Sequence, residues 1–146
     1  MTALTRRRSD NSHQETWSIY FDDIRIGQIG MRAGVPTSAQ PWAWSLGFYP
    51  GTDIGNRHHG TADTFEQARE AFERAWRKVA PTLTEADYDR WRAERDFSAW
   101  KHRMWDMKLA LPTQTSDGRA RCFCGEMIDV AGMHAHIQTA HRGIGA

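Results

Sequence analysis

The order of two cysteines and three histidines near the C-terminus limits what the last 25 residues of the chain can fold into. Cys122 and Cys124 are separated by one residue, and His136 and His141 follow with four residues between them. A disulfide within the cysteine pair is disfavoured because so short a loop is strained and removes little chain entropy. Thiolates and imidazoles are ligands that Zn²⁺ prefers, four at a time in tetrahedral geometry. These four side chains are therefore predicted to hold a structural Zn²⁺ ion.

The third ligand has an alternative, His134. It precedes His141 by seven residues, which is about two helical turns, so these two histidines would share one helix face. His136 is preferred because His134 would shorten a loop that is already short. Ile128 and Met133 are expected to pack beside the metal. A segment of this length buries too little apolar area to fold alone, so metal binding would supply its folding free energy.

With this ligand order, the segment resembles a C2H2-type zinc finger over about 20 of the 146 residues. It departs from that pattern twice, with one residue between the cysteines and 11 between Cys124 and His136. The usual spacings are about two to four and about 12 residues. The resemblance would place base-reading side chains near Asp129, Gly132 and Ala135, which are poor donors to base edges. Sequence-specific reading of DNA by this unit alone is not expected.

The charge of the chain is nearly balanced, with 19 basic and 18 acidic side chains, so no overall field attracts it to nucleic acid or an anionic membrane. The dense basic run Arg6-Arg7-Arg8 lies in a polar segment, residues 1–15, interpreted as a disordered tail. A phosphate-contacting arm is the alternative. No apolar stretch reaches the roughly 20 residues of a membrane span, and the N-terminus lacks the apolar segment of a signal peptide. A cytoplasmic location is predicted.

Three strands are indicated after residue 15. Alternating apolar residues over 17–21 and 24–29 predict a β-hairpin that turns at Asp22-Asp23, with Gly27 as a candidate bulge. A third strand is predicted where large apolar residues alternate at Trp42, Trp44, Leu46 and Phe48. Residues 51–62, which contain His58-His59, are interpreted as a Gly-rich connection.

Two helices follow. Thr64 and Gln67 form a predicted capping box, an apolar stripe continues from there, and Pro81 ends the first helix. The second helix is capped by Thr84 and runs towards Leu111. Six basic and six acidic side chains lie over residues 82–111, which indicates a solvated helix with ion pairs.

The predicted fold class is α+β, a three-stranded antiparallel sheet with two helices, plus a small C-terminal zinc-finger-like unit. The predicted organisation is a disordered basic tail at 1–15, an α+β domain at 16–112, a linker at 113–118 and the zinc-finger-like unit at 119–146. The strand-strand-strand-helix order resembles small uncharacterised bacterial β-β-β-α proteins. The nearest named family is the HicB-type antitoxins, with their partial double-stranded-RNA-binding-like fold. This resemblance covers about 65 residues and implies no catalytic residue.

The sequence contains no Walker-type loop, dinucleotide fingerprint or nucleophile elbow, and His58-His59 has no Ser, Cys or carboxylate cluster around it in sequence. We therefore expect a non-enzymatic, zinc-binding interaction or regulatory protein with no small-molecule substrate. Its partner would be a protein, as for an antitoxin, inhibitor or adaptor. The alternative is a nucleic-acid-binding regulator that uses the basic arm and the zinc unit, through Arg6, Arg7, Arg8, Arg119, Arg121 and Arg142.

Overall fold

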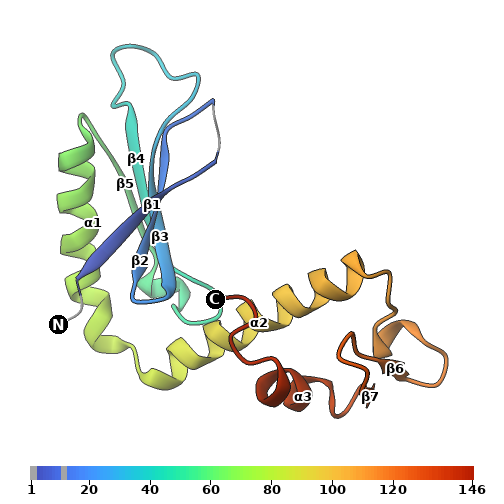
Figure 1. The fold of residues 1–146 in the computed structure, drawn as a ribbon. Helices are drawn as coiled ribbons and strands as arrows, with labels where there is room; N and C mark the ends of the chain where they lie inside the picture. The colour runs from blue at the N-terminus through green and yellow to red at the C-terminus, as the bar shows by residue number, and fades with distance from the viewer. Residues whose placement is uncertain (1–2, 11–12) are drawn as a thin grey trace. The chain divides into compact units, whose positions relative to one another are not determined.

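The computed structural model describes residues 3–10 and 13–146 and divides the chain into two compact units, Met1–Trp91 and Arg92–Ala146 (Figure 1). We call them the N-terminal unit and the C-terminal unit. Helix α2 (Glu85–Asp106) crosses the division and contributes residues to both. The sequence instead suggested a boundary at the linker 113–118.

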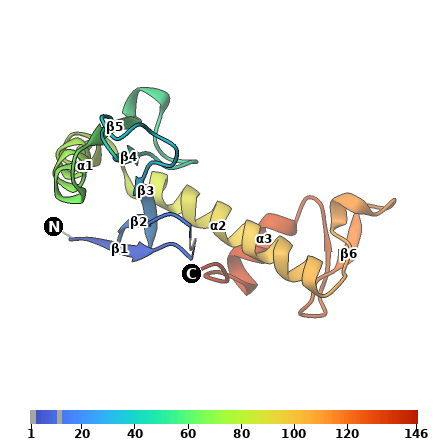
Figure 2. The same cartoon turned by 90° about the horizontal axis from the view of Figure 1, so that it is seen from above.

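The N-terminal unit is an antiparallel five-stranded sheet with one helix on its face. The strands lie in the order β1-β2-β3-β4-β5, and they are β1 (Leu4–Arg8), β2 (Thr16–Phe21), β3 (Ile24–Met31), β4 (Trp42–Leu46) and β5 (His58–Ala62). Helix α1 (Phe65–Val79) packs against β3, β4 and β5 (Figures 1 and 2). Two short 3-10 helices are also present, η1 (Ile54–Asn56) and η2 (Ala80–Thr82).

The predicted three-stranded sheet with two helices is wrong. The described part of the chain contains this five-stranded sheet, a second sheet of two strands and three α-helices. β1 forms within the segment assigned to a disordered tail. It pairs with β2, and the Arg6 guanidinium carbon lies 4.5 Å from the centre of the Trp17 ring. β5 forms within the predicted Gly-rich connection, and a Cβ at Gly60 would lie only 2.7 Å from Nε1 of Trp44. The glycine thus leaves room for the Trp44 ring to lie against β5.

The core of the N-terminal unit lies between the sheet and α1. The expected helix start is present, because Oγ1 of Thr64 accepts a hydrogen bond from the N–H of Gln67 at 3.1 Å. The Gln67 side chain in turn accepts the N–H of Asp63 at 3.2 Å. The buried apolar side chains of this core are Ile19, Ile24, Ile26, Ile29, Leu46, Phe48, Ala62, Ala68, Phe72, Ala75, Trp76, Val79 and Tyr88.

The C-terminal unit combines the second part of α2 with a small hairpin and a short helix. Its elements after α2 are the 3-10 helix η3 (Pro112–Gln114), β6 (Arg119–Arg121), β7 (Met127–Asp129) and α3 (Met133–Ala140). The six buried residues of its core are Trp100, Met104, Cys122, Ile128, Met133 and Ile137. Ile128 and Met133 are thus buried beside a cysteine, as expected. This core is much smaller than that of the N-terminal unit.

A buried carboxylate holds the C-terminal end of the chain on α2. Asp96 is 1% exposed, and its two oxygens accept the backbone N–H groups of Gly143 at 2.9 Å and Gly145 at 3.1 Å. Nε of Arg95 donates to the same carboxylate at 3.2 Å. Counting charges along α2 placed Asp96 on a solvated face, whereas the structure gives it a structural role.

Candidate metal centre

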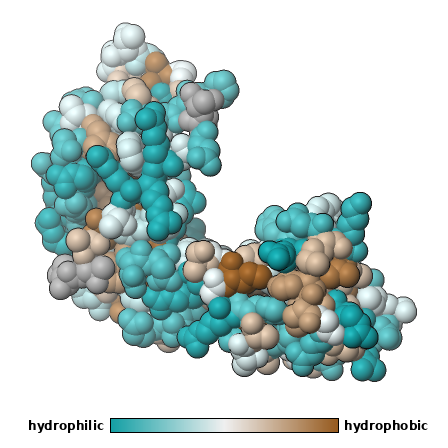
Figure 3. Space-filling model, viewed as in Figure 1, coloured by the Kyte–Doolittle hydropathy of each residue, from teal (hydrophilic) through white to brown (hydrophobic). Residues whose placement is uncertain are grey.

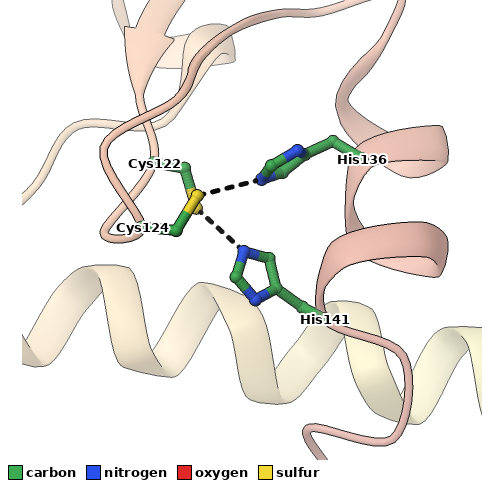
Figure 4. A group of neighbouring side chains, drawn as sticks. All are labelled: Cys122, Cys124, His136 and His141. Atoms are coloured by element: carbon green, nitrogen blue, oxygen red, sulfur yellow. Dashed lines mark hydrogen bonds between the residues drawn. The ribbon is translucent and has the colours of Figure 1, made fainter.

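A tight turn between β6 and β7 carries both cysteines. The N–H of Cys122 donates to the carbonyl of Glu126 at 2.8 Å, and the N–H of Gly125 donates to the carbonyl of Cys122 at 2.8 Å. Gly125 has a φ of +98°, a backbone conformation that residues with a Cβ rarely adopt. The turn therefore depends on glycine at this position, and it brings the two sulfurs to one side (Figure 4).

The two histidines come from α3 and from the residue that follows it. His136 lies within α3, whereas His141 caps its C-terminus and donates its backbone N–H to Ile137 at 3.0 Å. The two ring centres are 5.0 Å apart, and the ring planes are inclined at 74°. Both rings point at the sulfurs of the cysteine turn (Figure 4).

The four side chains are close enough to bind one metal ion. Their ligand atoms all lie within 4.8 Å of one another. Sγ of Cys122 is 3.4 Å from Nε2 of His141, and Sγ of Cys124 is 3.6 Å from Nε2 of His136. A tetrahedral Zn²⁺ with Zn–S of about 2.3 Å and Zn–N of about 2.05 Å places sulfur and nitrogen about 3.5 Å apart. The observed separations fit a metal centre of that size.

Two further side chains contact the ligands. Oε2 of Glu126 lies 2.9 Å from Nδ1 of His136, so the ring presents Nε2 to the cysteine side. Nε1 of the fully buried Trp100 donates to Sγ of Cys122 at 3.3 Å. Carboxylates and N–H donors in these positions fix the orientation of metal ligands and stabilise thiolate charge. Neither contact was predicted, because each joins two residues that are not neighbours in the sequence, Trp100 with Cys122 and Glu126 with His136.

The pKa values in the cluster reflect the crowding of four ligand groups. Burial lowers the pKa of His141 below its ordinary value, and the neighbouring His136 lowers it further. His141 is therefore favoured in the neutral form that binds metals. The backbone N–H of Glu126 lowers the pKa of Cys124, but desolvation and the adjacent Cys122 outweigh it, so this pKa is raised overall. A bound cation would reverse that balance, because it favours thiolate.

His134 lies apart from this cluster. Within the described residues, the group of close ligand atoms comprises Cys122, Cys124, His136 and His141. The ring of His134 instead packs on Phe97, with the ring centres 4.6 Å apart. Residues two positions apart on a helix point about 200° apart, so His134 and His136 cannot both face the cysteines.

The basic residues named from the sequence are spread over both units. Arg119 and Arg121 are exposed on β6, where Nη1 of Arg121 donates to the carbonyl of Gly125 at 2.6 Å. Arg142 is exposed after α3. Arg6, Arg7 and Arg8 belong to β1 in the N-terminal unit.

His58 and His59 lie on β5, opposite Leu46 and Ser45 of β4. No group of three or more candidate metal ligands forms around them in the described part of the chain. Across residues 3–10 and 13–146, no helix is both long enough and apolar enough to cross a membrane.

Comparison of the chain with protein-family models, with curated proteins and with solved structures finds no match. The HicB-like resemblance gains no support from these comparisons. The likeness to a C2H2 zinc finger rests on the Cys2His2 cluster and its geometry.

Proposed function

We propose that this chain is a non-enzymatic zinc-binding interaction protein, whose C-terminal unit folds around one Zn²⁺ held by Cys122, Cys124, His136 and His141. The observation that supports it best is the pair of sulfur–nitrogen separations, 3.4 and 3.6 Å, at the spacing of a tetrahedral zinc site. Four protein ligands complete that coordination and leave no position for water or a substrate, which favours a structural role over a catalytic one.

The surroundings of the cluster also favour zinc. Two thiolates with two imidazoles are a donor set that selects Zn²⁺ over Mg²⁺ or Ca²⁺, which take oxygen ligands. Cys122 and His136 are buried, whereas Cys124 is exposed and His141 is partly exposed, so the ion would be shielded from solvent on one side only. The core of this unit has only six buried residues, so it gains proportionately more from a metal than a larger core would.

The surface of the C-terminal unit supports a protein partner. Trp105 is 78% exposed and Met107 is 49% exposed at the end of α2. Trp105 also lines a hollow of about 440 Å³, together with Ser98, Lys101, His102, Leu109, Leu111 and Gln114. Figure 3 shows hydrophobic surface exposed on this unit. Exposed aromatic side chains beside a hollow are typical anchors of protein interfaces.

The charges around this hollow favour an acidic partner segment. Lys101 and His102 line it, and Lys108 is exposed close by in sequence, whereas Asp106 is the acidic residue of the same stretch. We infer that the partner presents an apolar side chain to Trp105 and acidic side chains to these bases. A free phosphate-contacting arm is a weaker candidate, because Arg6 and Arg8 lie over aromatic rings in an ordered strand.

A pull-down with the full-length protein tests this function. Zinc content is measured first. The wild type should contain about one equivalent of zinc and Cys124→Ser almost none, because structural sites need all four ligands. The wild type should then capture a protein partner in the presence of nuclease. Trp105→Ala should lose most of that capture, whereas Val130→Ala, which shortens another exposed apolar side chain of this unit, should retain it. Loss of every partner on nuclease treatment would contradict protein binding.

A further inference from the structure

The face of the large sheet opposite α1 is built from aligned cross-strand rows. One row crosses all five strands, and the strand register gives its members as Arg7, Ser18, Gln28, Ser45 and His59. The rows on either side are Thr5, Tyr20 and Arg25, and Thr16, Gly30, Ala43 and Thr61. We call these three rows the polar face. On β2, β3 and β4 its members alternate with apolar residues of the core under α1.

The polar face carries positive charge only. None of its residues, all within the described ranges, is Asp or Glu, although the chain has 18 acidic side chains. The guanidinium carbon of Arg7 lies 4.6 Å from the centre of the Tyr20 ring. Nη2 of Arg25 donates to Oε1 of Gln28 at 2.9 Å. A sheet face that serves only solubility usually mixes both signs of charge, so this composition indicates an anionic ligand.

Two hollows meet on this face. The larger, about 730 Å³, lies over small residues such as Gly30 and Ala43 and is bordered by Arg32. The second, about 340 Å³, is lined by Arg25 and by Tyr49, whose side chain is 78% exposed. Both are lined by Gln28 and Ser45, so the two hollows adjoin, and we call them together the depression. Neither lining contains a carboxylate among the described residues.

We propose that the polar face binds single-stranded nucleic acid. Arg25 and Arg32 contact phosphates at the two ends of the depression, and Tyr49 offers an exposed ring on which a base stacks. Arginines that follow the backbone and aromatic rings that stack on bases are the two elements of single-strand binding. Four interstrand gaps of about 4.8 Å make the face about 19 Å wide, enough for a short stretch of nucleotides.

The side chains between the arginines suit bases better than an acidic peptide. Gln28, Ser18, Ser45 and His59 supply donors and acceptors for the edges of unpaired bases, which single strands expose. A duplex hides those edges and its stacked faces. The site lies within the N-terminal unit and uses none of the metal ligands, so it does not depend on the proposed zinc centre.

Fluorescence anisotropy with the full-length, zinc-loaded protein tests the proposal. The probes are labelled oligouridylate and oligothymidylate of about 12 nucleotides and a duplex of the same length, a size in the range of known single-strand sites. At about 50 mM NaCl we expect saturable binding of the single strands, at least about tenfold tighter than of the duplex. Ribose and deoxyribose probes distinguish RNA from DNA. No saturable binding, or equal affinity for the duplex, would overturn the proposal.

Variants at exposed positions locate the site. Arg25→Glu with Arg32→Glu should weaken single-strand binding at least tenfold and reduce the slope of log affinity against log salt by about 1.4, since each phosphate contact contributes about 0.7. Tyr49→Ala should weaken binding at least about fivefold and leave the salt slope unchanged. Arg77→Glu, an exposed charge reversal on α1, is the matched control and should bind like the wild type.

The outcomes separate this site from the zinc unit. Cys124→Ser should retain single-strand binding even where it loses zinc. If Cys124→Ser abolishes binding while the Arg25/Arg32 double variant binds normally, the nucleic-acid site lies in the C-terminal unit and the proposal is wrong. If Arg77→Glu and the double variant lost single-strand affinity equally, the loss would reflect the overall charge of the protein and not a site on the polar face. That result would also overturn the proposal.

Discussion

The backbone conformation at the end of α3 decides which histidines face the cysteines. His136 and His141 would point about 140° apart on a continuous helix, which is a poor arrangement for two ligands of one ion. His141 avoids this because it caps α3 with a φ of −128° and a ψ of 22°, outside the helical region. Its ring therefore turns back towards Cys122. Helical periodicity alone favours His134, whereas the length of the loop from Cys124 and the end of the helix at Ala140 both favour His136.

Single substitutions of the histidines test this assignment. His136→Ala should remove most of the bound zinc, because it deletes one of four ligands and leaves Glu126 without its imidazole partner. His134→Ala should keep about one equivalent, since its ring contacts Phe97 and not the cysteines. The measurement is metal content by mass spectrometry after purification without chelators. Zinc retained by His136→Ala and lost from His134→Ala would show that the ligand set is wrong.

Elements with local signals were predictable, and elements that depend on distant contacts were not. The start of α1 is set by Thr64 and Gln67, which are neighbours in sequence, and the hairpin of β2 and β3 follows from alternation around Asp22-Asp23. The predicted irregularity near Gly27 also corresponds to a shift in register between these strands. β1 and β5 lack strong alternation of apolar residues, and they are the two edge strands of the sheet.

Contacts with the rest of the sheet explain both missed strands. Leu4 packs on the core, and Arg6 covers the rings of Trp17 and Phe65, so a polar, basic segment gains enough contact to be ordered. Gly60 weakens the strand signal of β5, yet its lack of a side chain makes room for Trp44. The residues that β1 and β5 contact lie outside the short stretch of sequence from which each strand is predicted.

The contact between Asp96 of α2 and the end of the chain gives a prediction for the stability of the C-terminal unit. Asp96→Ala should lower the unfolding free energy of the C-terminal unit by about 2 kcal/mol, because two backbone N–H groups lose a buried carboxylate partner. Asp106→Ala, at an exposed position of the same helix, should change it by less than about 0.5 kcal/mol. Denaturant unfolding of the zinc-loaded protein, followed by amide hydrogen exchange of residues 119–141, measures the difference within this unit. Equal stabilities of the two variants would contradict the role of Asp96.

At the scale of the whole molecule, a net charge of +1 does not show where the charged side chains lie. Helix α1 carries both signs, and Arg69 pairs there with Glu66 and Glu73, whereas the three rows of the polar face contain no acidic residue. The amino-acid composition shows only that the chain as a whole produces no strong electrostatic field. The strand register shows where one sign of charge gathers, and the register could not be derived without β1 and β5.

The two units also differ in what stabilises them. Thirteen buried residues form the core of the N-terminal unit, without any candidate metal ligand cluster among its described residues. Six form the core of the C-terminal unit, and one of these is the proposed ligand Cys122. Metal removal should therefore unfold one unit and leave the other folded, because metal-binding free energy is folding free energy only where the ligands are.

Hydrogen exchange of the full-length protein, followed by mass spectrometry before and after zinc is removed with a chelator, tests the central claim most directly. Amides of residues 119–141 should lose their protection without zinc and regain it when zinc is restored, whereas amides of β2, β3 and β4 should exchange at unchanged rates. The claim would be contradicted if residues 119–141 stayed equally protected after complete zinc removal, or if the purified protein bound no zinc.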